Sequence, residues 1–499
     1  MRSKNPAMPP SSKTLAHPNL ILGICCLSLL VVSMDVTIVN VALPAMRRDL
    51  NATISGLQWV VDAYTLVVAS LLMLSGSMAD RFGRRRVFQI GMALFTVGSV
   101  LCSLAPTINC LVAFRAVQGL GASMLNPVAL SIITNTFHEP KARAKAIGVW
   151  GAMAGVSLSL GPIIGGALTE SIGWRSIFWV NLPIGLLALL LTALFVPESK
   201  AAQPRAFDPI GQILILVLLA SLTCAVIEGP QAGWGSLQTM GLFAISFVAL
   251  ILFLVYEHRC PGPLLDLRFF RSVPFSSATL IAVCSFSAFA GFLFLNAIYL
   301  QQARGFSAIT TGLCTLPLAL MSMVCAPLSG RMVAHHGTLR SLLFAGCAIF
   351  TSGLLLTWLT ASTSLPFLLL AYLIFGAGFG MVNIPITHTA ISGMPRSQAG
   401  VAAAVASTSR QVGASLGVAV AGTFIGASRV QELGFAQASH PYWWVVAGAG
   451  AAIGLLGWIS STAWAHESAR SVAHLLADHH EGHKNPHDLA ETNPIPGKS

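Results

Sequence analysis

Long apolar runs separated by short polar segments make up most of this 499-residue chain. A helix that crosses the hydrocarbon core of a bilayer needs about 20 mainly apolar residues. Fourteen runs approach or exceed this length, and each predicts one membrane-spanning helix. They lie at about 20–44, 56–79, 87–105, 109–133, 145–168, 174–196, 209–228, 238–256, 273–301, 310–333, 340–360, 364–390, 399–427 and 441–465.

The composition supports a membrane protein. Apolar residue types account for 55% of the chain and charged residues for only 9%, whereas soluble domains carry about 25% charged residues. So few charges exclude a water-soluble protein of this size. The absence of a fixed glycine period and of a polar composition excludes fibrous and disordered classes. The expected fold is therefore an all-α membrane protein.

The positive charges fix the expected orientation. The net charge of +11 could suggest nucleic-acid binding, but lysine and arginine occur in short clusters between apolar runs, which is typical of cytoplasmic loops. With the N-terminus inside, 21 of the 28 lysines and arginines fall in inner segments and five in outer ones. Arg115 and Arg410 remain within predicted spans. We therefore expect both termini in the cytoplasm, no nucleic-acid partner, and a first span that is retained rather than cleaved as a signal peptide.

Two halves of the chain are related. Residues 75–86 (SGSMADRFGRRR) correspond to 329–340 (SGRMVAHHGTLR) at an offset of 254, and 118–126 correspond to 375–383 at an offset of 257. Two repeated six-helix halves are common in secondary transporters. The predicted organisation is an N-terminal tail, a six-helix half, a two-helix insertion, a second six-helix half and a His-rich tail, at 1–18, 19–200, 201–260, 261–465 and 466–499.

The loop after the second span reads GSMADRFGRRR, from Gly76 to Arg86. Its arginines alone indicate only a basic inner loop. Glycines on both sides of an acidic–basic pair indicate more, because glycine permits close helix contact and tight turns. We expect this loop to latch the two halves in the outward-facing state through Gly76, Asp80, Arg81, Gly83 and Arg84.

The fourth and fifth spans carry two further motifs. In RAVQGLGASMLNP, from Arg115 to Pro127, helical spacing places Arg115, Gln118 and Asn126 on one face. An arginine within hydrocarbon is costly and marks either a functional site or a structural ion pair. The fifth span ends in GPIIGG, a small-residue stripe that favours close helix packing.

These motifs together resemble the major facilitator superfamily, and within it the 14-span drug:proton antiporter family of quaternary-ammonium and multidrug exporters. The resemblance covers nearly all of residues 20–465 and includes MDVTIVNVALP (34–44), WRSIFWVNLPIG (174–185), YLQQARGFSAITTGL (299–313) and RQVGASLGVAV (410–420). It implies two six-helix halves plus two inserted helices, and an exporter in the bacterial inner membrane that expels lipophilic compounds by alternating access. It also implies that the antiporter motif comprises Gly155, Gly161, Pro162, Gly165 and Gly166.

Acidic side chains within the spans are the candidate transport residues. Asp35 lies in the middle of the first span, and Asp62 lies near the outer end of the second, between Trp59 and Tyr64. Both positions are acidic in the quaternary-ammonium exporters that the chain resembles. We predict that Asp35 and Arg115 couple transport to protons and that Asp62, with cation–π support from its aromatic neighbours, attracts monovalent lipophilic cations. The remaining predicted cavity residues are Gln118, Asn126, Tyr299, Asn383 and Arg410.

The remaining acidic, cysteine and histidine residues are not expected to take part in transport or metal binding. Glu228 and Glu257, at helix ends, are expected to be solvated, and the ten cysteines show no metal-binding spacing. His479, His480 and His483 could bind a metal, but an unstructured soluble tail is the preferred interpretation. The predicted metal content is none.

Three functions remain open at this point. The preferred one is a monomeric, proton-coupled multidrug exporter that uses the proton motive force and no cofactor, with small lipophilic molecules, protons and the lipid bilayer as its partners. A dedicated exporter of an endogenous metabolite, antibiotic or siderophore would share the fold. A membrane sensor or embedded enzyme is disfavoured, because no zinc motif, nucleophile elbow or phosphate loop occurs.

Overall fold

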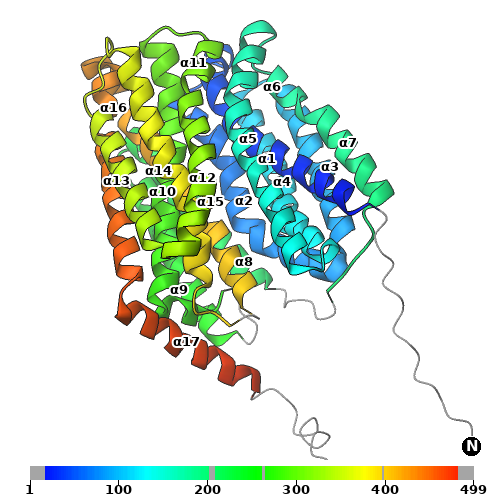
Figure 1. Ribbon diagram of the computed structural model, residues 1–499. Coiled ribbons are helices and arrows are strands. Elements are labelled where there is room, and N and C mark those ends of the chain that lie inside the picture. Colours follow the sequence, from blue (N-terminus) through cyan, green and yellow to red (C-terminus); the bar gives the residue numbers. More distant parts are fainter. Residues whose placement is uncertain (1–16, 202–207, 261–264, 396–397, 482–499) are drawn as a thin grey trace, which may run out of the picture.

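The computed structural model describes residues 17–201, 208–260, 265–395 and 398–481, and every regular element in these ranges is a helix (Figure 1). The first half contains α1 (Pro18–Asp49), α2 (Ile54–Phe82), α3 (Arg84–Ser103), α4 (Ile108–Thr136), α5 (Pro140–Ser171), α6 (Ser176–Trp179) and α7 (Asn181–Phe195). The insertion contains α8 (Pro209–Ala232) and α9 (Leu237–Arg259). The second half contains η1 (Leu267–Arg271), α10 (Val273–Ile298), η2 (Tyr299–Ala303), α11 (Ala308–Cys314), α12 (Leu316–His336), α13 (Leu339–Leu356), α14 (Leu365–Ile391), α15 (Ala399–Phe424), α16 (Ala427–Ser460) and α17 (Ala463–Glu481).

Among the described residues, 13 helical segments are long and apolar enough to cross a membrane. The predicted span at 399–427 is not one of them, although α15 occupies this stretch as a helix of 26 residues. The polar run from Ser407 to Gln411 dilutes its apolar content. Because α15 packs within the bundle against α10, α2 and α8, it completes the set of 14 helices without needing a fully apolar surface.

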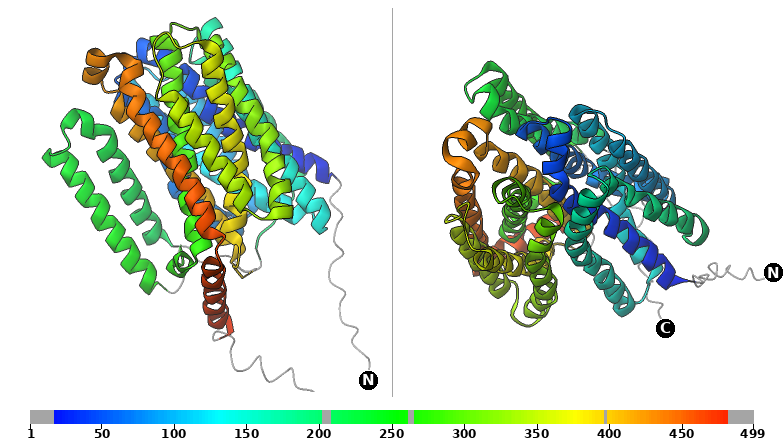
Figure 2. Two further views of the ribbon diagram at one scale, coloured as in Figure 1. Left: turned by 60° about the vertical axis from the view of Figure 1, so that its left-hand side comes forward. Right: turned by 90° about the horizontal axis from the view of Figure 1, so that it is seen from above.

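The two halves repeat one packing scheme. In the first half α1 packs on α5, α2 on α4, and α3 on α4 and α7; in the second α10 packs on α15, α12 on α14, and α13 on α14 and α16. Seen from above, the blue-to-cyan first half and the yellow-to-orange second half lie side by side (Figure 2). The predicted fold of two related six-helix halves plus two inserted helices is confirmed.

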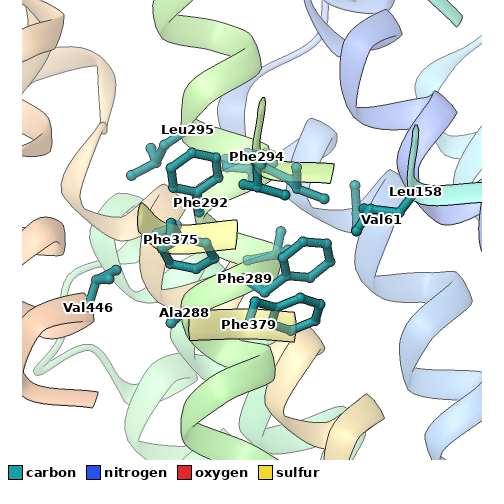
Figure 3. Packing of buried hydrophobic residues seen from close by; sticks show 14 of the residues in the cluster. Val61, Leu158, Ala288, Phe289, Phe292, Phe294, Leu295, Phe375, Phe379 and Val446 are labelled. Carbon is teal, nitrogen blue, oxygen red and sulfur yellow. The ribbon is translucent and has the colours of Figure 1, made fainter. Parts of the chain in front are cut away.

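Buried aromatic residues form the core of the second half. Phe292 stacks on Phe375 with ring centroids 4.7 Å apart, and Phe289 stacks on Phe379 at 4.1 Å (Figure 3). Phenylalanines supply large apolar surfaces to such contacts. The same cluster continues into the first half through Val61 and Leu158, so it also joins the two halves.

The inserted hairpin lies at the edge of the bundle (Figure 2). Helix α8 contacts α2 and α15, whereas α9 packs mainly on α8. The outer surface of α9 exposes large apolar side chains such as Phe247, Ile251 and Val255. An exposed apolar surface of this kind suits contact with lipid.

The C-terminal tail differs from the prediction. Residues 463–481 form α17, which runs across one end of the bundle (Figure 1). Ala465, Ala469 and Val472 are buried, and the Ser468 hydroxyl accepts a hydrogen bond of 3.0 Å from the backbone N–H of Val273. The expectation of an unstructured tail is therefore wrong for this segment, because it has an apolar stripe at helical spacing.

Candidate transport site

One large cavity of about 2370 Å³ lies between the two halves. Helices α1, α2, α4 and α5 line it from the first half, and α10, α12, α14 and α15 line it from the second. The lining reaches the helix ends at Asp80, Arg268 and Gln398. We call this end of the bundle the basic end, because it also carries Arg81 and Arg84 to Arg86.

Direct contacts between the halves seal the opposite end, here called the closed end. The Gln301 side chain donates a hydrogen bond of 2.7 Å to the backbone carbonyl of Val41, and Arg47 donates one of 2.8 Å to Gln302. Gln58 of α2 donates to the carbonyl of Ala419 in α15 at 2.8 Å. The cavity is therefore accessible from the basic end and blocked at the other.

Asp35 forms a buried ion pair with Arg115 inside the first half. The Arg115 Nη1 lies 2.5 Å from the Asp35 Oδ2, and both side chains are at most 1% exposed. Gln118 and Asn181 donate hydrogen bonds to the other oxygen, Oδ1, at 2.8 and 3.2 Å. The carboxylate is thus held by three side chains from α4 and α7. The structure brings together the two residues that the sequence assigned to proton coupling.

Arg115 has partners beyond Asp35. Its Nε donates to the carbonyl of Val60 at 3.0 Å, its Nη1 donates to Gln118 at 2.7 Å, and its guanidinium lies 4.3 Å from the centroid of the Tyr64 ring. Charged hydrogen bonds and a cation–π contact offset the cost of burying this cation. Neither Asp35 nor Arg115 is among the residues that line the cavity.

Asp62 has a different environment. Its side chain is fully buried, the Thr65 hydroxyl approaches its Oδ1 at 3.4 Å, and Ser415 of α15 lies near the same carboxyl. Its Oδ2 has no hydrogen-bond partner among the described residues. Asp62 therefore lies at the packed contact between α2 and α15, outside the lining of the cavity.

The predicted cavity residues separate into two groups. Asn126, Asn383 and Arg410 line the cavity. The others lie outside the cavity lining in this conformation. Gln118 donates a hydrogen bond to Asp35, and the Tyr64 ring makes the cation–π contact with Arg115. Trp59 donates to Glu228 of α8 at 3.1 Å, and the Tyr299 hydroxyl donates to the Thr360 carbonyl at 2.7 Å. Helical spacing identified polar positions but did not show which side of the helix faces the cavity.

The α2–α3 loop wraps around Glu198, a residue that the sequence interpretation did not single out. Gly83 has a φ of +115°, and a Cβ there would lie 2.5 Å from the Glu198 carboxylate, so only glycine fits. The carboxylate accepts a hydrogen bond from the backbone N–H of Arg85 at 3.1 Å. Within the loop, Arg84 pairs with Asp80 at 3.2 Å. The glycine turn is thus anchored to the end of the first half.

Gly76 does not make the close helix contact expected from the sequence. It lines the cavity, and a Cβ there would meet no atom within 4 Å. Asp80 also lines the cavity, while Arg81 is exposed. Because the basic end is open here, any contact of these residues with the second half belongs to another conformation, and the latch stays a prediction.

The antiporter motif lies where α5 meets both halves. A Cβ on Gly165 would lie 2.7 Å from the Ile38 side chain of α1, and one on Gly166 would lie 2.5 Å from the carbonyl oxygen of Ala308 in α11. Gly161 packs against Thr37, and Gly312 of α11 packs against the carbonyl of Pro162. Gly155 faces the cavity near Met323. These small residues let backbones approach at the closed end.

Acidic groups in the cavity lining occur only near the basic end, within the described part of the chain. They are Asp80, Glu257 and Asp266. Glu257 is 3% exposed and accepts a hydrogen bond from the Leu265 N–H, so the expectation of a solvated side chain is wrong for this residue. Glu228 also has a hydrogen-bond partner, because it accepts from the indole N–H of Trp59. Hydrogen bonds from Arg268 to Asp266 raise the pKa of that arginine, so the guanidinium stays charged.

Comparison with known proteins places the chain in a family. Residues 25–418 match the family model described as Major Facilitator Superfamily. The chain belongs to the major facilitator superfamily. Multidrug resistance protein Stp of Mycobacterium tuberculosis (strain CDC 1551 / Oshkosh) is 39% identical over 401 residues, covering 80% of this chain and 74% of that protein. The tetracenomycin C resistance and export protein of Streptomyces glaucescens is 35% identical over 425 residues, covering 85% and 79%.

Solved structures support the same fold. A peptide transporter POT in complex with sulfate superimposes with a TM-score of 0.65 at 15% identity, covering 92% of this chain and 97% of that one. At this identity the likeness concerns the superfamily fold alone.

Several residues of the site were not singled out from the sequence. Asn181 was part of a recognised motif, WVNLPIG, yet its contact with Asp35 depends on how α7 packs. Phe286, Thr387 and Ser407 surround Arg410, and nothing in their local sequence marks them. The described residues hold no cluster of three metal-binding side chains, and the side chains of His479, His480 and His483 lie outside them.

Proposed function

We propose that this superfamily member exports lipophilic drug-like compounds from the cytoplasm in exchange for protons, by alternating access. The names of the relatives support drug export, since one is a multidrug resistance protein and another a resistance and export protein. The large cavity between the halves can hold a substrate. The positive-inside rule assigns the basic end to the cytoplasm, so the described conformation is inward-facing.

The observation that carries proton coupling is the sealed Asp35–Arg115 pair. Asp35 lies on α1, whose Ser33, Thr37 and Asn40 line the cavity, so one helix touches both the ion pair and the substrate space. Protonation of Asp35 would remove the negative charge that balances Arg115. A buried cation that loses its partner costs several kcal/mol, roughly 3–5, which is enough to shift a two-state equilibrium.

A packed route connects this pair to the closed end. Ile38, one turn after Asp35, contacts Gly165 of α5, and the adjacent Gly166 contacts Ala308 of α11 in the other half. A displacement of α1 on protonation would therefore reach the contact that seals the closed end. In our proposal the proton reaches Asp35 from outside in the outward-facing state, in which this contact is open. The contact then re-forms as the cavity turns to the cytoplasm, and the proton leaves to the cytoplasm when Asp35 and Arg115 pair again.

The test uses everted membrane vesicles, in which the cytoplasmic end faces the medium. Asp35→Asn should abolish substrate accumulation driven by an imposed pH gradient. Because this change leaves Arg115 unpaired, the double variant Asp35→Asn/Arg115→Gln serves as a matched control that restores charge balance. Both variants should reach the membrane, bind substrate in detergent and fail to respond to the gradient.

Two outcomes would contradict the proposal. One is gradient-driven accumulation at the wild-type level by Asp35→Asn at matched expression. The other is recovery of gradient-driven accumulation in the double variant, which would show that only charge balance matters at this site.

Export of a single endogenous compound is a second candidate. It is favoured by the 35% identity to a tetracenomycin C resistance and export protein. Resistance profiles of cells with and without the protein, across cationic biocides, dyes and antibiotics, separate the two: protection against several unrelated classes supports multidrug export, and protection against one class supports a dedicated exporter.

We also propose that the protein acts as a monomer in the bacterial inner membrane with both termini in the cytoplasm.

A further inference from the structure

The charge of the cavity changes along its depth. Near the basic end its described lining contains both acids and arginines, including Asp80, Arg268 and Arg271. Deeper in the bundle Arg410 is the one charged residue of the described lining. It lies 11 residues into α15, which corresponds to about 16 Å from the start of that helix. The middle of the cavity therefore carries a fixed positive charge.

Arg410 has hydrogen-bond partners but no counter-ion among the described residues. Its Nη2 donates to the Thr387 hydroxyl at 2.6 Å and to the Asn383 carbonyl at 3.3 Å, and its Nη1 donates to the Ser407 hydroxyl at 3.3 Å. No carboxylate of the described chain forms an ion pair with it. A guanidinium has five N–H groups, so two are left over, one of them on the buried and unpartnered Nε.

This arrangement contrasts with the other arginine of the spans. Arg115 is neutralised by Asp35 at 2.5 Å, whereas the hydrogen-bond partners of Arg410 within the described residues, Thr387, Asn383 and Ser407, are all neutral. A cation held at membrane depth without a counter-charge is costly and is functional by default. Neutral hydroxyl and carbonyl partners fix the position of the guanidinium but do not neutralise its positive charge.

An aromatic wall adjoins Arg410. The guanidinium carbon lies 6.0 Å from the centroid of Phe286, which meets Phe379 edge-on at 5.2 Å. Phe379 stacks on Phe289, and all three rings line the cavity. Figure 3 shows the stacked pair, with Val61 and Leu158 of the first half across from it. A flat apolar ring system can lie on this wall while a charged substituent reaches Arg410.

We propose that the cavity recognises lipophilic aromatic anions, with the carboxylate, sulfonate or phenolate group on Arg410 and the ring system against Phe286, Phe289 and Phe379. The inference rests on the proposed export function and specifies its substrate class. It reverses the sign of charge expected from the sequence, because that expectation required Asp62 to face the cavity. The bound anion supplies the counter-charge that no described residue of the protein provides.

The test measures binding of two xanthene dyes of similar shape and opposite charge to the purified full-length protein in detergent, by fluorescence polarisation. Fluorescein is the anionic probe and rhodamine 123 the cationic one. The variants are Arg410→Gln, which removes the charge, Arg410→Lys, which keeps it, and Arg410→Glu, which reverses it. Arg331→Gln removes an exposed arginine of α12 outside the cavity and is the matched control.

Wild type and Arg331→Gln should bind fluorescein more tightly than rhodamine 123. Arg410→Gln should weaken fluorescein binding about tenfold or more, the loss expected for a charge-assisted hydrogen bond, without weakening rhodamine 123 binding. Arg410→Lys should keep the preference for the anion and Arg410→Glu should invert it. Monodisperse elution and retained rhodamine 123 binding identify a folded variant.

Tighter binding of rhodamine 123 by the wild type, or unchanged fluorescein binding in folded Arg410→Gln, would overturn the proposal. Either result would leave proton-coupled export intact, since substrate-dependent proton movement is measured separately. Conversely, anion binding at Arg410 without any proton-driven transport would contradict the export function and not the binding site.

Discussion

Asp35 and Asp62 are similar in sequence, since each is an acid within an apolar helix, but the structure gives them different neighbours. Asp35 balances a buried arginine and accepts three hydrogen bonds. Asp62 has no ion-pair partner in the described part of the chain, and one of its oxygens has no hydrogen bond. The two carboxyls are therefore expected to respond differently to the same substitution.

Replacing each aspartate by asparagine should lower the free energy of unfolding by different amounts. Asp35→Asn leaves Arg115 buried without a counter-ion, which should cost about 3–5 kcal/mol. Asp62→Asn leaves no charge unpaired and keeps a polar group near Thr65, so its cost should stay within about 1 kcal/mol. Thermal unfolding in detergent measures both, and a larger loss for Asp62→Asn would show that Asp62 has a charged partner in the folded protein.

The sequence identifies the charged residues of the spans but not their surroundings. Asp35, Arg115 and Arg410 stand out because charges are rare in apolar runs. Whether Arg410 faces the cavity or another helix depends on the rotation of α15, and sequence spacing fixes that rotation only relative to other residues of the same helix. The contact of Asn181 with Asp35 cannot be predicted either, because an asparagine at a helix start has many possible partners.

At the scale of single helices, the glycines of α5 set the distance between the halves. Gly166 has no room for a side chain, because a Cβ would lie 2.5 Å from the Ala308 carbonyl and 2.7 Å from the Ile309 Cα. Backbone atoms cannot move aside as a flexible side chain can. The contact at the closed end therefore depends on glycine at this position.

Gly166→Ala should open the closed end. We expect severalfold faster labelling of a single cysteine placed at Thr310 and a loss of transport. Gly23→Ala, at a helical glycine of α1 with no atom within 4 Å of an added Cβ, is the matched control and should change neither. If Gly166→Ala transports normally and its labelling is unchanged, the closed end does not depend on this contact.

The α2–α3 loop is predicted to act in the opposite conformation. In the described state Asp80 lines the open cavity and pairs with Arg84. The second half carries Ala334 at the equivalent position, so the first half supplies the acid. If Asp80 latches the outward-facing state, Asp80→Asn should make single cysteines at the basic end react severalfold faster with a labelling reagent than in the wild type. Labelling rates that are the same in the variant and the wild type, at both ends of the bundle, would count against a latch.

At the scale of the whole molecule, the sequence predicted the helix bundle and its two halves correctly. Repeated motifs at nearly constant offsets indicated the duplication, and the packing of α1 on α5 and of α10 on α15 repeats it. The sequence could not show which end is sealed, because both ends of an alternating transporter can close with the same helices. The prediction of an unstructured tail is wrong for α17, because a short amphipathic pattern near a chain end does not show by itself that it packs on the bundle.

The central claim is that substrate and proton move in opposite directions through the same protein. The most direct measurement places purified protein in liposomes with a pH-sensitive dye inside, imposes an outward substrate gradient without a pH gradient, and records the internal pH. The account predicts that substrate efflux acidifies the interior in the wild type, and that Asp35→Asn shows no pH change. An internal pH that stays constant during substrate efflux by the wild type, or that rises, would contradict proton antiport.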